Sequence, residues 1–208
     1  MLALATVLTA ADPRPAPELV IKAANGQEQL LSKFRGKVVA LEFLLTTCPH
    51  CQKASQTMQK LYKELGPQGF QPVGVAINDM ANMLINDYSK QFNLTYPIGY
   101  ANRDVATQFL QHPIMMSMLM PQVVIIDRKG VIRHQFPGGD KFFENEEKNM
   151  RDVVLPLLKA GAATPAPAAP KKPAAAAGAA KSAKYPQLTN SCGRARSSSL
   201  ASSCAGRA

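Results

Sequence analysis

The chain has 208 residues, of which 46% are hydrophobic, so it can bury one core of ordinary size and still carry extensions. Its net charge of +10 is unevenly placed, because residues 161–208 hold 7 of the 24 Lys and Arg and none of the 14 Asp and Glu. Only four cysteines occur, which excludes a small scaffold stapled by disulfides. No apolar run approaches the roughly 20 residues of a membrane-spanning helix.

The first segment, residues 1–15, has two interpretations. An apolar run from Leu2 to Ala10, followed by small residues, is typical of a secretory signal segment. Because the run is short and no basic residue precedes it, a disordered lead is the alternative. We expect the folded domain to occupy residues 16–160.

The first half of that domain predicts a β-hairpin, a strand and a helix. Residues 18–31 alternate around the turn signal Asn25-Gly26, which is typical of paired strands. Residues 37–45 form an apolar run too short for a typical helix, so we predict a buried central strand. The helix that follows places apolar side chains on one face and ends at Gly66-Pro67; these side chains are Ala54, Met58, Leu61 and Leu65.

The second half continues the alternation. Residues 72–78 predict a second buried strand, and Asn78 or Asp79 is expected to cap a helix with Met80, Leu84 and Tyr88 on one side. A short helix over 102–110, a hairpin over 122–136 and a helix over 144–159 complete the pattern. The order predicts an α/β fold with a mixed central sheet flanked by helices and an N-terminal β-hairpin.

Residues 161–208 change in character. An Ala/Pro/Lys-rich linker leads into a basic Ser/Arg-rich end that contains Cys192 and Cys204, and no apolar periodicity is present. We expect this part to be disordered, and its last residues are either a natural tail or the product of a shifted reading frame. Its charge would permit weak contact with an anionic surface, but nothing in it predicts specific binding of nucleic acid.

The stretch EFLLTTCPHCQK, from Glu42 to Lys53, carries the chemistry. Cys48 falls where the strand ends and the helix begins, and Pro49 suits the first helical turn. Unpaired backbone N–H groups there, together with a charged His50, would favour a negatively charged sulfur. We therefore predict Cys48 as the nucleophile and Cys51 as the resolving thiol of a redox pair.

Two other uses of a CxxC pair are disfavoured. Structural zinc needs four ligands, and the only other cysteines lie about 140 residues further along, in the tail. A purely structural disulfide that closes so small a loop would constrain the unfolded chain little.

The combination of FRGKVVALEFLLTTCPHC, a second βα unit and MPQVVIIDRKGVIRHQFPGG resembles the thioredoxin fold in its TlpA/ResA-like branch, over roughly residues 16–158. The resemblance implies that Pro121 is a cis-proline facing the cysteines, with the backbone of Met120 offered to an extended substrate. It also implies that Glu42 is the buried acid that handles the proton of the resolving thiol. The alternative for Glu42 is a structural partner of some lysine.

The active dipeptide departs from that branch. Pro49-His50 is the dipeptide of the bacterial oxidant DsbA, whereas TlpA-like reductants usually carry a tryptophan where Thr47 stands here. The long helical insertion of DsbA is absent. The direction of electron flow is therefore left open.

Two other functions are alternatives for a chain with these residues. A peroxiredoxin-like thiol peroxidase would need threonine and proline three and seven residues before its cysteine, where this chain has Leu45 and Leu41. A Cu(I)-binding chaperone would use soft sulfur ligands, which four methionines near the thiols could supply; the alternative is a pliable apolar rim for protein substrates. The four methionines are Met115, Met116, Met118 and Met120.

The sequence thus predicts a thiol–disulfide oxidoreductase that exchanges electrons with protein thiols or disulfides and with an upstream redox partner. No dissociable cofactor or metal is required for this chemistry. We expect a monomer outside the cytoplasm, periplasmic or secreted.

Overall fold

The structure is a computed structural model, and it describes residues 13–160. The expected tail over 161–208, with Cys192 and Cys204, lies outside the described residues, as does most of the expected lead over 1–15. Within 13–160, no helix is both long enough and apolar enough to cross a membrane.

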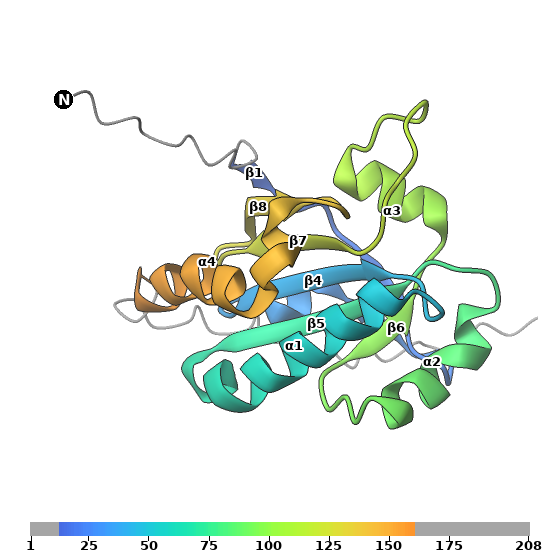
Figure 1. Cartoon of the computed structure of the whole chain (residues 1–208), viewed down its shortest axis with the longest axis horizontal. Coiled ribbons are helices and arrows are strands. Elements are labelled where there is room, and N and C mark those ends of the chain that lie inside the picture. Colours follow the sequence, from blue (N-terminus) through green and yellow to red (C-terminus); the bar gives the residue numbers. More distant parts are fainter. Residues whose placement is uncertain (1–12, 161–208) are drawn as a thin grey trace, which may run out of the picture. The chain divides into compact units, whose positions relative to one another are not determined.

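One mixed sheet forms the centre of the described part (Figure 1), with its eight strands in the order β1-β8-β7-β4-β5-β6-β2-β3. Strand β4 pairs with β5 in parallel and with β7 in antiparallel fashion. The predicted hairpins are the antiparallel pairs β2–β3 and β7–β8. The strands are β1 (Arg14–Pro15), β2 (Val20–Lys22), β3 (Glu28–Leu30), β4 (Val38–Leu44), β5 (Phe70–Ala76), β6 (Ile98–Tyr100), β7 (Gln122–Ile126) and β8 (Val131–Phe136).

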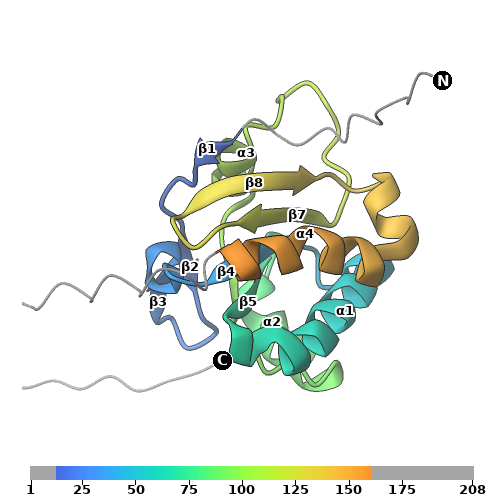
Figure 2. The ribbon, with the colours of Figure 1, turned by 90° about the vertical axis from the view of Figure 1, so that its left-hand side faces the viewer.

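Helices cover both faces of this sheet. Figure 2 shows α1 and α4 together on one side, where their apolar faces share one buried cluster. The opposite face is covered by α3 and the turn η1. The helices are η1 (Leu31–Phe34), α1 (Pro49–Leu65), η2 (Gly66–Gln68), α2 (Ala81–Gln91), α3 (Arg103–Leu110), η3 (Lys141–Asn145) and α4 (Glu146–Ala160).

Strand β4 is buried along its whole length, as expected of a central strand. Because side chains alternate between the two faces of a strand, Val39, Leu41 and Phe43 enter the cluster beneath α3. Val38 and Ala40 enter the cluster beneath α1 and α4. Each large apolar side chain buried in this way contributes roughly 1.5–3 kcal/mol. The same alternation directs Glu42 to the face covered by α1.

The prediction for α2 was wrong in two details. Its buried residues are Ala81, Ile85 and Tyr88, whereas Met80 and Leu84 are exposed. Neither Asn78 nor Asp79 caps it: Met80 occupies the N-cap position with a positive φ and no side-chain cap. The side-chain oxygen of Asn78 is instead bonded to the backbone N–H of Thr46. The side chain of Asn78 therefore makes a tertiary contact instead of the capping bond that the local pattern predicted.

Two strands and one helix start were also missed. Strands β1 and β6 have only two and three residues, too few for an alternation to be read. Strand β1 includes Arg14 and Pro15, within the segment expected as the lead. The last helix begins at Glu146 and not at Glu144, because the 3-10 turn η3 precedes it.

Candidate active site

The two cysteines lie at the junction of β4 and α1, as the spacing predicted. Cys48 is the N-cap residue of α1, is partly buried, and donates its backbone N–H to the carbonyl of Leu45 at 3.1 Å. Cys51 is one turn further along, and its side chain is completely buried. Both are free thiols in this structure. The first cysteine is therefore the more accessible of the two.

The dipeptide between the cysteines faces solvent. Pro49 is the first residue of α1, where its missing N–H is tolerated, and both Pro49 and His50 are exposed. The predicted influence of His50 on the sulfur of Cys48 stays a prediction.

Glu42 lies beneath the cysteine pair with no exposed surface. Burial raises the pKa of Glu42 well above its ordinary value of 4.5, and the charge of Glu146 raises it further. Its Oε2 accepts a hydrogen bond of 2.8 Å from the hydroxyl of Ser55. Its Oε1 is buried and has no hydrogen-bond partner among the described residues. One carboxylate oxygen is therefore free to take a proton.

Cys51 and Glu42 affect one another. Burial raises the pKa of the Cys51 thiol far above its ordinary value of 9.0, and the nearby charge of Glu42 raises it further. A thiol in this environment needs a base beside it before it can attack. Glu42 is the carboxylate next to it, so the arrangement suits transfer of a proton from sulfur to carboxylate.

Two hydroxyl groups that the sequence did not single out complete the surroundings of Glu42. Ser55 lies four residues after Cys51, on the same face of α1, and its hydroxyl is 2.9 Å from that of Tyr88 on α2. Both side chains are buried. The available signal was a serine at the i+4 position from Cys51, on the face of the helix that the sequence predicts to be buried.

The segment before β7 lies beside the thiols. The Met120–Pro121 peptide bond is cis, and Pro121 is buried. Met120 packs against the buried cluster that contains Cys51, as does Cys48. The predicted role of Pro121 and Met120 in binding a substrate stays a prediction.

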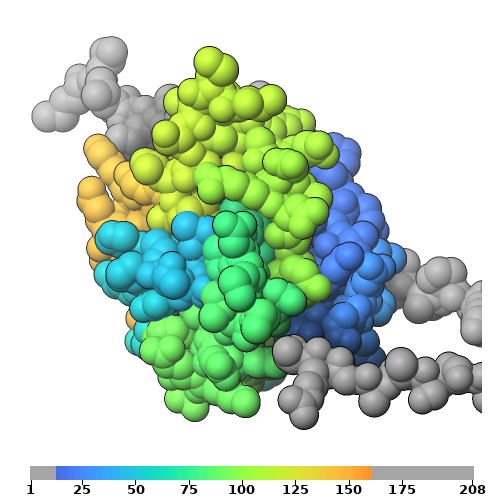
Figure 3. All heavy atoms as spheres, turned by 90° about the vertical axis from the view of Figure 1, so that its right-hand side faces the viewer, coloured from blue at the N-terminus to red at the C-terminus, as the bar shows by residue number. Residues whose placement is uncertain are grey.

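Exposed apolar side chains lie on two segments of the face that carries this site. Figure 3 shows the start of α1, the start of α2 and the segment from α3 to β7 on one face of the molecule. The last two carry side chains that expose large apolar areas: Met80, Met83 and Leu84 on and just before α2, and Ile114, Met115, Met116 and Leu119 on the loop before β7. Ile114 and Met115 are 90% and 95% exposed, so they have almost no contact within the chain.

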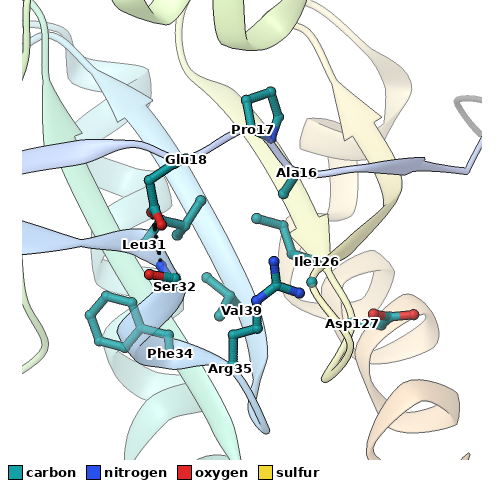
Figure 4. A pocket seen from close by; sticks show the side chains of 11 residues that line it. Ala16, Pro17, Glu18, Leu31, Ser32, Phe34, Arg35, Val39, Ile126 and Asp127 are labelled. Atoms are coloured by element: carbon teal, nitrogen blue, oxygen red, sulfur yellow. Dashed lines mark hydrogen bonds between the residues drawn. The ribbon is translucent and has the colours of Figure 1, made fainter. Parts of the chain in front are cut away.

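Figure 4 shows a separate hollow of about 80 Å³ between the N-terminal hairpin and the turn after β7. Its walls include Glu18, Arg35 and Asp127, and Glu18 accepts a hydrogen bond from the backbone of Ser32. None of the predicted site residues lines it. Within residues 13–160, no group of three or more His, Cys, Asp and Glu side chains is arranged to hold a metal ion.

The fold and the site together define a thioredoxin-like protein with a CxxC pair at the start of its first long helix. The family model described as Redoxin matches residues 9–154, and the chain belongs to this family. The expected fold and the expected relationship to the TlpA/ResA-like branch are both confirmed.

Curated relatives include two bacterial proteins. The thiol-disulfide oxidoreductase ResA of Geobacillus kaustophilus (strain HTA426) is 27% identical over 139 residues, which cover 66% of this chain and 75% of ResA. The thioredoxin-like protein YneN of Bacillus subtilis (strain 168) is 27% identical over 137 residues, which cover 64% of this chain and 75% of YneN.

Two solved structures share the fold. One is a thiol:disulfide interchange protein, thioredoxin family protein, from Chlorobium tepidum TLS, with a TM-score of 0.59 and 23% identity over 71% of this chain and 98% of that one. The other is a secreted thiol-disulfide isomerase from Corynebacterium glutamicum, with a TM-score of 0.59 and 21% identity over 69% of this chain and 85% of that one. The comparisons favour neither the peroxidase nor the copper chaperone.

Proposed function

The protein is a thiol–disulfide oxidoreductase, and we propose that Cys48 attacks the substrate and Cys51 resolves the mixed disulfide. The observation that carries this assignment is the contrast in burial within one helical turn. Cys48 is partly exposed at the N-cap of α1, whereas Cys51 is fully buried and adjoins the carboxylate of Glu42. A substrate can reach the first sulfur, and the second can reach only its neighbour.

In the reducing direction, the thiolate of Cys48 attacks one sulfur of a substrate disulfide. A bond forms between Cys48 and that sulfur, and the other substrate sulfur leaves as a thiolate. Cys51 then gives its proton to Glu42 and attacks the sulfur of Cys48. The mixed disulfide breaks, the second substrate thiolate leaves, and the Cys48–Cys51 disulfide remains. The reverse sequence oxidises a substrate dithiol.

Glu42 acts in this scheme as the base for the resolving step. Burial raises the pKa of Cys51 and of Glu42, so both groups hold a proton more strongly than they would in water. A carboxylate with a raised pKa is a better proton acceptor at neutral pH than an ordinary one. The unpartnered Oε1 supports this role.

Substrates of this protein are extended, apolar segments of other proteins that carry a cysteine. Support comes from the Met120–Pro121 segment beside the thiols and from the exposed apolar loop next to it. Methionine side chains adapt to varied partners because they are flexible and polarisable. We expect Met115 and Met116 to bind the substrate side chains that flank its cysteine.

The direction of exchange depends on the redox poise of the pair. Thioredoxin and DsbA differ by about 150 mV, or roughly 7 kcal/mol for two electrons, and the chain combines a TlpA/ResA-like body with the DsbA dipeptide. An upstream redox partner must restore the starting state after each cycle. We place the protein outside the cytoplasm on the strength of its likeness to ResA and of the signal-like run in residues 1–15.

The test is the equilibrium of the cysteine pair in glutathione buffers of graded ratio. Cys192 and Cys204 are replaced by serine so that only Cys48 and Cys51 take part in the measured equilibrium. We expect one reversible two-electron transition, and we expect Cys51→Ser to abolish it while accumulating a mixed disulfide at Cys48. Absence of a reversible couple, or rapid consumption of peroxide by Cys51→Ser, would overturn the proposal.

A further inference from the structure

Three buried polar side chains from three elements meet beneath Cys51. They are Glu42 on β4, Ser55 on α1 and Tyr88 on α2, and their exposed fractions are 0%, 0% and 4%. The Ser55 hydroxyl is 2.8 Å from Glu42 Oε2 and 2.9 Å from the Tyr88 hydroxyl. A chain of polar contacts so deep in a core costs free energy unless each of its members is paired.

The direction of these hydrogen bonds follows from the number of hydrogens. An ionised carboxylate can only accept, so Ser55 donates its single hydroxyl hydrogen to Glu42. Ser55 then has no hydrogen left for Tyr88, and Tyr88 must donate its own to the oxygen of Ser55. The chain runs from Tyr88 through Ser55 to the carboxylate, and each step favours the charged form of Glu42.

The hydrogen bonds from Tyr88 through Ser55, and not a cation, balance the charge of Glu42. Within residues 13–160, no Lys, Arg or His forms an ion pair with Glu42. Of the groups that bear on it electrostatically, none is positively charged. They are Cys48 and Cys51 of α1, Tyr88 of α2, Tyr96 in the loop before β6 and Glu146 of α4.

We propose that Ser55 and Tyr88 are positioning residues that hold Glu42 as a carboxylate aimed at Cys51. This inference rests on the proposed function, because it concerns the base for the resolving step. During that step the Cys51 proton moves to Glu42 Oε1, the Cys51 sulfur bonds to the Cys48 sulfur, and the substrate sulfur leaves with the electron pair of the broken bond. Ser55 remains bonded to Oε2 throughout, so the two hydroxyls orient the acid without transferring a proton.

The test follows the resolving step by itself. The full chain with Cys192→Ser and Cys204→Ser is reduced and mixed with an excess of the aryl disulfide of thionitrobenzoate in a stopped-flow instrument. Attack by Cys48 releases one coloured thiolate, and attack by Cys51 on the mixed disulfide releases the second. The rate of the second phase, measured across a pH series, reports the acid–base behaviour of the Cys51 and Glu42 pair.

We expect Ser55→Ala to shift the pH–rate profile of the second phase, so that its rising limb lies about one unit higher in pH. The reason is that the carboxylate loses a hydrogen-bond donor, which raises its pKa. Tyr88→Phe should move the limb in the same direction by less, because Tyr88 acts only through Ser55. The double variant should match Ser55→Ala, since both changes break the same chain. Ser55→Thr keeps the hydroxyl and should restore the original limb.

Ser89→Ala is the matched control. Its hydroxyl lies on α2 next to Tyr88 but donates to the backbone carbonyl of Ile85 at 2.8 Å, not to Ser55 or Glu42. It should leave the pH limb in place. The rate of the first phase, compared with that of the parent, shows whether the region around Cys48 is still folded in each variant.

The outcomes separate this inference from the function on which it rests. If Glu42→Gln removes the pH limb while Ser55→Ala and Tyr88→Phe leave it unchanged, the hydroxyl chain has no positioning role and the inference is wrong. If the chain with both Cys48 and Cys51 shows no second phase, the proposed function itself fails.

Discussion

The side-chain oxygen of Asn78 accepts a hydrogen bond of 3.0 Å from the backbone N–H of Thr46. The carbonyl of Thr46 accepts a second one, of 3.1 Å, from the side chain of Gln52. Thr46 lies two residues before Cys48, so the chain leading to the first cysteine is held from the end of β5 and from α1.

Replacement of Asn78 by alanine should loosen this loop. Thr46 is 8% exposed, so its backbone N–H would be left without a partner in a buried place, at a cost of about 1–2 kcal/mol in the free energy of unfolding. Thiol exchange should slow several-fold because the sulfur of Cys48 is less well positioned. Urea unfolding and exchange kinetics measure the two effects. In Asn25→Ala, which removes a side-chain to backbone bond in the exposed hairpin turn, exchange should keep its rate.

Gly138 permits close contact with the segment that precedes Pro121. A β-carbon there would lie 2.5–2.7 Å from backbone atoms of Leu119 and Met120, which cannot move aside as a side chain can. Gly138→Ala should therefore displace that segment, lower the free energy of unfolding by about 1–3 kcal/mol and reduce exchange with protein substrates. At Gly66 a β-carbon would meet only the ring of Tyr62, at 3.2 Å, so Gly66→Ala should be milder in both assays. Equal effects of the two substitutions would contradict this account.

Glu146 makes the stability of the fold depend on pH. Burial raises the pKa of Glu146 to about 7 from its ordinary value of 4.5, so between these values the folded chain binds the proton more tightly than the unfolded chain does. The contribution of this residue to the free energy of unfolding therefore falls as pH rises from about 4.5 through 7, and the loss is complete above 7.

Glu146→Gln should remove this dependence. Glutamine resembles the protonated acid, so the variant should match the parent near pH 4 and exceed it by about 1–3 kcal/mol near pH 8. Urea unfolding at both pH values measures the difference. Glu144 is exposed just ahead of the same helix, and Glu144→Gln should leave the stability difference between the two pH values as it is. A gain from Glu146→Gln that is equal at both pH values would assign the effect to packing.

The exposed methionines before β7 predict selectivity for protein substrates. Met115→Ser with Met116→Ser should raise KM for a protein disulfide several-fold, because apolar contact area is lost, and leave the rate with a small aryl disulfide unchanged. The side chains are 95% and 64% exposed, so stability should not change. Leu30→Ser, an exposed apolar change on the N-terminal hairpin, is the control and should leave both substrates unaffected. An equal loss with both substrates would argue against a docking role.

Much of the fold could be predicted because its signals are local. The apolar run of β4, the repeat of Ala54, Met58, Leu61 and Leu65 on α1 and the hairpin turns each fall within a few residues. The exposed face of α2 and the short strands β1 and β6 escaped prediction, since they depend on what lies beside them in space.

The CxxC pair, its position at a helix N-terminus and the acid in the preceding strand were determined by the sequence alone. They follow from the apolar pattern and the residue spacing within the 10 residues from Glu42 to Cys51, which belong to one strand–helix unit. Only the tertiary structure decided which groups surround that acid. Ser55 meets Tyr88 across 33 positions, and Thr46 meets Asn78 across 32, because α1, α2 and β5 pack together on the sheet. Hydrogen bonds of about 3 Å depend on that packing, and no local pattern encodes it.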